Sequence, residues 1–219
     1  MSVLPSAADL VARLESEITR SVDEHNLESR QLVKQQLSIE DGELRDALGP
    51  AVLCLGLGPA LGKGEDATLA PAVALGLLAH MGRVFAELQG QRRGLSLGWG
   101  MPRALNAGDA CFALAQDQLN RGSQTLAAES RLLAADMFDS AARALSEALY
   151  TGGGQEGDAV TEAWRVLYPH AARLAGIFVG VPPNGLARLE ELGEELASAE
   201  APSIEAALAR AAALESESA

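Results

Sequence analysis

The amino-acid sequence predicts a single all-α domain, and three observations carry this prediction. The 219-residue chain is 48% hydrophobic but only 4% aromatic, and the helix formers alanine and leucine dominate it. Its apolar residues recur at spacings of three and four, which is the period of an amphipathic helix. The sequence has no strand-like alternation of useful length, no internal repeat and no domain linker. We therefore expect one helical bundle over residues 1–219.

The first helix is expected to open after Pro5. Ser6 can cap it, and Asp9 suits the positive end of the helix dipole. One face carries apolar residues at helical spacing, namely Leu10, Leu14, Ile18, Val22 and, further along, Leu32. This face is expected to pack against the bundle, while the opposite face is solvated.

The next two helices surround a glycine-rich turn. A second helix is expected over about 44–61, and Gly49-Pro50 is expected to bend or restart it. A third helix is expected to run to about Leu88, with either Asp66 or Thr68 as its cap.

Five helices are expected in the second half of the chain. They cover about 102–120, 123–150, 159–179 and 186–198, and a last, alanine-rich helix follows Pro202. Pro169 is expected to kink the helix over 159–179. The glycine-rich stretch 151–158 is expected to be a flexible loop, and the final residues 215–219 are expected to be frayed.

Charge and cysteine usage limit the classes of partner. The chain has 30 acidic and 17 basic residues and a formal net charge of −13, which argues against nucleic acid and against anionic membranes. Cys54 and Cys111 lie far apart in apolar segments and are expected to be buried thiols. The start of the chain has no targeting pattern, and glycine or proline interrupts the longest apolar runs. We expect a cytoplasmic protein with no membrane span.

Two short motifs allow more than one interpretation. The segment DMFDS places Asp136 and Asp139 three residues apart on one helix face, where they could hold a divalent cation or belong to a solvated surface. The segment FAELQGQRRG ends the third helix on Arg92 and Arg93. Adjacent arginines beside a glycine suit a phosphate or carboxylate ligand, and they equally suit the last carbonyl groups of the helix.

The neighbourhood of these arginines resembles a known family. The chain reads LLAHMGRVFAELQGQ, then Arg92-Arg93-Gly94, then WGMPRALNAGDACFALA, and later AARLAGIFVGVPPNGLARLEELGEELA. This order resembles the trans-isoprenyl diphosphate synthase (polyprenyl synthetase) family over about 44–199. In that family an Asp-rich motif ends a helix and an Arg-Arg-Gly follows. The resemblance implies the isoprenoid synthase fold, with Arg92 and Arg93 as candidate diphosphate ligands.

The departures from the family pattern concern the residues that hold metal. The family uses two Asp-rich clusters, whose magnesium ions grip an allylic diphosphate as it leaves. Here Glu87 is the only carboxylate at the first cluster, and neither the second cluster nor the family's final helices have a counterpart. We therefore expect a C-terminally shortened member of this fold. We also predict that the chain alone does not ionise an allylic diphosphate.

Three functions fit these observations. The first is a non-catalytic, dimerising or regulatory subunit, which forms a homodimer or a heterodimer with a catalytic isoprenyl diphosphate synthase and needs no cofactor. The second is an active prenyltransferase or terpene-forming enzyme of altered mechanism. It would hold magnesium on Glu87 with Asp136 and Asp139, or with Asp109, while Arg92 and Arg93 bind an isoprenyl diphosphate. The third is a protein that binds a prenyl chain or another apolar ligand.

Overall fold

Helices account for the regular structure in the part of the chain that the computed structural model describes, which is residues 4–25, 31, 33–34, 42–90, 98, 100–151, 163–200 and 202–218. No strand occurs among these residues, which confirms the predicted all-α class. The elements are α1 (Ala7–Glu24), α3 (Gly42–Ala60), α4 (Asp66–Gly90), α6 (Met101–Gly122), the 3₁₀ helix η1 (Ser123–Thr125), α7 (Ala128–Thr151), α9 (Leu167–Val179), α10 (Pro183–Ser198) and α11 (Ile204–Ser218).

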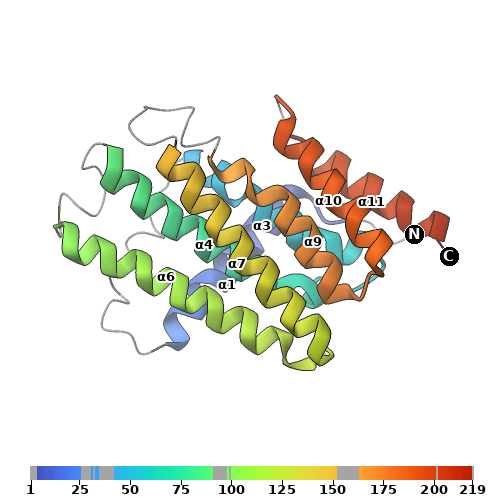
Figure 1. Ribbon diagram of the computed structural model, residues 1–219, viewed down its shortest axis with the longest axis horizontal. Coiled ribbons are helices and arrows are strands. Elements are labelled where there is room, and N and C mark those ends of the chain that lie inside the picture. The colour runs from blue at the N-terminus through green and yellow to red at the C-terminus, as the bar shows by residue number, and fades with distance from the viewer. Residues whose placement is uncertain are drawn as a thin grey trace.

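The centre of the bundle consists of α3 and α4. Residues 47–58 of α3 and 71–84 of α4 are all buried, so both helices are enclosed on every side. Helices buried in this way are apolar around most of their circumference. The helices α1, α6, α7 and α9 pack against α4, while α1, α9 and α11 pack against α3 (Figure 1).

The apolar character of α4 could indicate a membrane-spanning helix or a buried core helix, and its packing favours the core helix. Its segment Asp66–Gln89 is long and apolar enough to cross a membrane, but 78% of its most apolar window is buried inside the bundle. A buried core helix of this kind passes the same length and composition test. The location of α4 between five other helices accounts for its composition.

A side-chain hydrogen bond repairs the defect that a proline makes in α3. Pro59 has no backbone N–H, so the carbonyl group of Leu55, four residues earlier, loses its helical donor. The hydroxyl group of Thr68 on α4 donates to this carbonyl at 2.9 Å. Thr68 therefore joins the two central helices, instead of acting as the cap that the sequence suggested. Gly58 leaves room for the hydroxyl, because a Cβ atom there would lie 2.6 Å from Thr68 Oγ1.

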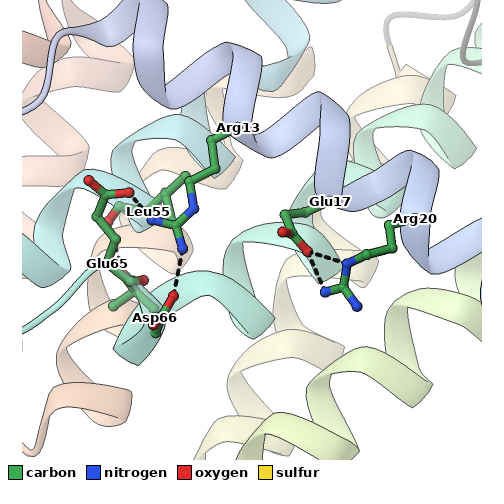
Figure 2. Close-up of polar contacts among 7 residues, drawn as sticks. Arg13, Glu17, Arg20, Leu55, Glu65 and Asp66 are labelled. Atoms are coloured by element: carbon green, nitrogen blue, oxygen red, sulfur yellow. Dashed lines mark hydrogen bonds and ion pairs between the residues drawn. The ribbon is translucent and has the colours of Figure 1, made fainter.

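The first helix starts as predicted and is tied to the start of α4 by charge. The N–H of Asp9 donates to Ser6 Oγ at 3.2 Å, which confirms the N-cap. Figure 2 shows the Arg13 guanidinium between Glu65 and Asp66, where it bonds both carboxylates. Its contact with Asp66 measures 2.5 Å. This bidentate clamp joins two segments more than fifty residues apart.

Four apolar residues of α1 are buried as the spacing predicted, namely Leu10, Leu14, Ile18 and Val22. Leu32 lies outside the described residues, as does most of the glycine-rich stretch 151–158. Both cysteines are buried, and burial raises the pKa of the Cys111 thiol to about 12. The last helix, α11, is assigned to Ser218, and the predicted fraying of residues 215–219 stays a prediction.

Two predicted kinks differ from the structure. The helix α3 runs through Gly49-Pro50 without a break, since complete burial on all sides compensates for one missing hydrogen bond. In the segment that leads to α9, the break falls at Val166 and not at Pro169. Pro169 occupies the third position of α9, where its missing N–H would have no helical partner. Its ring clashes with the carbonyl group of Arg165, which ends the preceding turn.

Gly193 sets the distance between α9 and α10. A Cβ atom at Gly193 would lie 2.5 Å from Pro169 Cα and 2.6 Å from the Tyr168 carbonyl oxygen, so only a glycine fits against this backbone. We expect Gly193→Ala to lower the free energy of unfolding by about 1–3 kcal/mol, because two backbone segments must separate. Urea denaturation measures this change.

Gly64→Ala is the matched control, because a Cβ atom at Gly64 would meet nothing within 4 Å. Its free energy of unfolding is expected to stay within about 0.5 kcal/mol of the wild-type value. Equal stability of the two variants would mean that α9 and α10 are not in the close contact described.

Candidate functional site

The last turns of α4 carry a row of polar side chains in an otherwise apolar helix. His80, Arg83 and Glu87 are spaced by three and four residues and therefore share one face. His80 and Arg83 are only 3% and 8% exposed. Sequence reasoning singled out Glu87 and missed the other two. Their helical spacing inside the run GLLAHMGRVFAEL was the signal that could have found them.

Arg83 and Glu87 form an ion pair that is largely excluded from water. Arg83 Nε donates to Glu87 Oε1 at 3.0 Å, and the two side chains are 10% and 15% exposed. An i,i+4 pair of this kind contributes little on a solvated helix. With water mostly removed, the attraction is stronger, and so is the cost of leaving either charge alone. The carboxylate of Glu87 is therefore already compensated by a cation of the same helix.

His80 is a neutral base held in the core. Burial, and then the positive charge of Arg83, lower the pKa of His80 from 6.5 to about 3. Its Nδ1 atom is buried and finds no hydrogen-bond partner among the described residues. The segment before α9 covers the neighbouring backbone, where Trp164 Nε1 donates to the carbonyl oxygen of Ala79 at 3.3 Å.

The block Ala107-Gly108-Asp109 packs α6 against this end of α4. Ala107 and Gly108 are buried, and a Cβ atom at Gly108 would lie 3.1 Å from the ring of Phe85 on α4. Asp109 is exposed on the outer side of α6. One turn later the ring of Phe112 stacks on Phe138 of α7, with centroids 6.2 Å apart. The small residues of the motif thus serve helix packing.

The remaining predicted site residues do not gather around Glu87. Asp136 and Asp139 are both exposed on α7. No group of three or more histidine, cysteine, aspartate or glutamate side chains is placed to hold a metal ion within the described part of the chain. The donors found there do not fit a magnesium cluster, which needs several carboxylate oxygens. Arg92 and Arg93 lie outside the described residues, so their role as diphosphate ligands stays a prediction.

Solved structures with this arrangement of helices share one fold. The geranylgeranyl pyrophosphate synthetase from the archaeon Geoglobus acetivorans superimposes with a TM-score of 0.68 at 17% identity, covering 85% of this chain and 64% of that one. The geranyl diphosphate synthase small subunit from Antirrhinum majus superimposes with a TM-score of 0.69 at 14% identity. The match covers 98% of this chain and 94% of that one. An isoprenoid synthase family member from Thermotoga neapolitana superimposes with a TM-score of 0.64 at 17% identity. The match covers 93% of this chain and 87% of that one.

The chain has the trans-isoprenyl diphosphate synthase fold. Sequence identities of this size show a common fold but do not show a common function. No family model and no curated protein matches the sequence. The chain spans 64% of the length of the Geoglobus synthetase but 94% of the Antirrhinum small subunit. The sequence resemblance placed the first Asp-rich cluster at Glu87, and in the structure Glu87 forms an ion pair with Arg83.

The Arg83–Glu87 pair makes a prediction about stability. Glu87→Gln is expected to lower the free energy of unfolding by about 1–3 kcal/mol, because a mostly buried guanidinium loses its counter-charge. The double variant Arg83→Met/Glu87→Gln is expected to cost less than the two single changes together. Urea denaturation of the four proteins gives the coupling energy.

Asp136→Asn, at an exposed carboxylate of α7, is the control and should change the free energy of unfolding by less than about 0.5 kcal/mol. Repeating the series with magnesium chloride separates the two roles of Glu87. Stabilisation by magnesium that disappears in Glu87→Gln would identify a metal ligand and contradict the ion-pair assignment.

His80 makes a prediction about acid stability. Its pKa in the folded chain, about 3, lies below the ordinary value of 6.5, so between these values only the unfolded chain binds the proton. The free energy of unfolding should therefore fall as the pH drops below 6.5, by at most about 1.4 kcal/mol per pH unit from this group. His80→Leu should have a shallower slope between pH 6.5 and 4 in urea denaturation. Parallel slopes for the two proteins would show that His80 is accessible to protons in the fold.

Proposed function

We propose that this chain is a non-catalytic isoprenyl diphosphate synthase-like subunit that pairs with a catalytic synthase. The observation that carries the proposal is the state of Glu87, the only acidic residue of the segment 85–93, which is bonded to Arg83 and largely excluded from water. A carboxylate that is already paired with a guanidinium is a weak ligand for a metal ion, because a dication that binds there would displace the guanidinium. We propose that the subunit works in the cytoplasm and without magnesium.

The likeness to a synthase small subunit supports the same proposal. The Antirrhinum structure carries the name of a synthase small subunit, and the two chains cover 98% and 94% of one another. The Geoglobus synthetase is longer, and this chain spans 64% of it. A non-catalytic subunit with this fold would contribute packing surface to a complex, while its partner performs the chemistry.

The outer side of α6 and α7 offers a surface for pairing. The four large apolar side chains that are exposed in the described residues all lie on these two helices, namely Met101, Leu105, Leu132 and Tyr150. The two helices carry six acidic and four basic residues, which is close to balance in a chain of net charge −13. Apolar exposure with little net charge favours association with another protein surface. We call this surface, defined by α6 and α7, the outer face.

The functional experiment has two arms. In the first, purified protein with magnesium and labelled dimethylallyl, geranyl or farnesyl diphosphate is expected to give no product above the buffer control. In the second, a catalytic isoprenyl diphosphate synthase from the same cell is expected to co-purify with this chain, and its product length should change when the chain is added. Turnover by the chain alone would overturn the proposal.

Charged substitutions on the outer face test the pairing. Leu105→Glu/Leu132→Glu should weaken association at least about tenfold, because the complex would bury carboxylates without partners. Sedimentation velocity measures the association and circular dichroism confirms the fold. Ala187→Glu, at an exposed position of α10, is the matched control and should associate like the wild type. A wild-type chain that is monomeric and binds no synthase would contradict this use of the face.

A further inference from the structure

A groove lies at the opposite end of the bundle from Glu87. It has a volume of about 380 Å³ and forms where α3 ends, at Leu61 and Lys63, and where α9 turns into α10. The helix α4 runs from this end to Glu87, so at 1.5 Å per residue the two places are roughly 30 Å apart. The groove is therefore separate from the end of α4 that faces the predicted diphosphate site, and an inference about it does not depend on the proposed function.

One wall of the groove is apolar and has a fixed shape. Leu61 and Leu189 are buried beneath it, and Val179 and Val181 are half-buried at its surface. The turn between α9 and α10 is a Schellman motif, in which Val181 N–H donates to the Gly176 carbonyl oxygen at 2.9 Å. Gly180 occupies the left-handed position of this motif, with φ of 80°. The wall is thus preformed and does not need a ligand to shape it.

The rim of the groove carries two cations that the chain leaves uncompensated. Lys63 and Arg188 both line it and both are exposed. Neither forms an ion pair or a side-chain hydrogen bond with the rest of the described chain. In a chain of net charge −13, two cations that line one groove and lack ion pairs within the described residues can attract an anionic group.

Three nearby carboxylates are bonded to two arginines other than Arg188. Glu65 and Asp66, which follow Lys63 in the chain, both bond Arg13, as Figure 2 shows. Glu190, two residues after Arg188, bonds Arg173 at 2.5 Å. No carboxylate of the described chain forms an ion pair with Lys63 or Arg188, so the ammonium and guanidinium groups remain available to an anion, although exposed Glu191 lies three residues after Arg188.

We infer that this groove binds a single-chain anionic amphiphile, with the anionic head between Lys63 and Arg188 and the apolar tail on the wall formed by Leu61, Val179 and Leu189. Two cations alone would attract any small anion, but they do not account for the apolar wall beside them. The volume lies at the lower end of the range for small-molecule pockets, which suits one short chain and not a membrane surface.

Three probes separate the contributions of head and tail. Octyl phosphate below its micellar concentration carries both features, inorganic phosphate carries only the anion, and octanol carries only the chain. In isothermal titration calorimetry, octyl phosphate is expected to bind at least about tenfold more tightly than either of the others. Shortening it to hexyl phosphate should weaken binding by roughly threefold to fourfold for each methylene lost from the wall.

Variants assign the effect to the groove. Lys63→Gln/Arg188→Gln should weaken octyl phosphate binding at least about fivefold and leave octanol binding unchanged. The matched control is Arg131→Gln/Arg143→Gln, which removes two exposed cations from α7 and should bind like the wild type. All four positions are exposed, so circular dichroism should show unchanged folding.

Three results would overturn the inference. One is equal loss of octyl phosphate binding in the groove variant and the α7 control, which would indicate a general charge effect. Another is binding of octyl phosphate no tighter than inorganic phosphate, which would remove the role of the apolar wall. The third is binding only to phosphatidic acid vesicles and not to the free amphiphile, which would indicate a membrane surface as the ligand.

Discussion

The complete burial of α3 and α4 is the constraint on which the other features of this molecule depend. A helix enclosed on all sides has no water to satisfy its polar groups, so each of them must find a partner inside the bundle or lose its charge. The carbonyl group of Leu55, freed by a proline, takes the hydroxyl of Thr68. The acid Glu87 takes the guanidinium of Arg83. His80 loses its charge, because its pKa falls far below neutrality.

The same constraint explains how this fold can persist without an acidic cluster. Several carboxylates facing one another in a bundle repel and are costly to bury unless cations neutralise them. A chain with a single carboxylate at the end of α4 has no such repulsion to overcome. Arg83 of the same helix supplies a positive charge next to it. Arg83 thus performs, for stability, the neutralisation that metal ions would provide where more acids are present.

Sequence patterns predicted the features that depend on local periodicity. The buried face of α1, the cap at Ser6 and the approximate helix boundaries all follow from spacing and from the preferences of single residues. The packing role of Gly108 also agrees with the family-like segment around it. The features that sequence analysis missed depend on partners far away in the chain. Arg13 meets carboxylates more than fifty residues later, and Thr68 pairs with a carbonyl of another helix.

The effects of the prolines also depend on surrounding helices that the local sequence does not reveal. A local rule predicts a break at Pro50, but the helices around α3 supply enough burial to keep it continuous. At Pro169 the rule identifies a real interruption, but the residue belongs to the start of the following helix, so the break precedes it. The sequence also predicts only part of the candidate site. The sequence identified Glu87 because it lies where the family has an Asp-rich motif. The roles of His80 and Arg83 became clear only from the burial of α4 in the structure.

The distribution of surface charge then restricts how two such molecules can meet. The exterior of α10 and the start of α11 carries a run of exposed glutamates, namely Glu191, Glu194, Glu195, Glu200 and Glu205. Two acidic chains repel through such a surface, and the repulsion acts over about a Debye length, or roughly 8 Å at physiological salt. The helices α6 and α7 of the outer face are nearly balanced in charge and carry exposed apolar side chains, so repulsion is weaker along this face than along the glutamates of α10 and α11. Net charge alone would keep these chains apart. Its uneven distribution favours one orientation of approach.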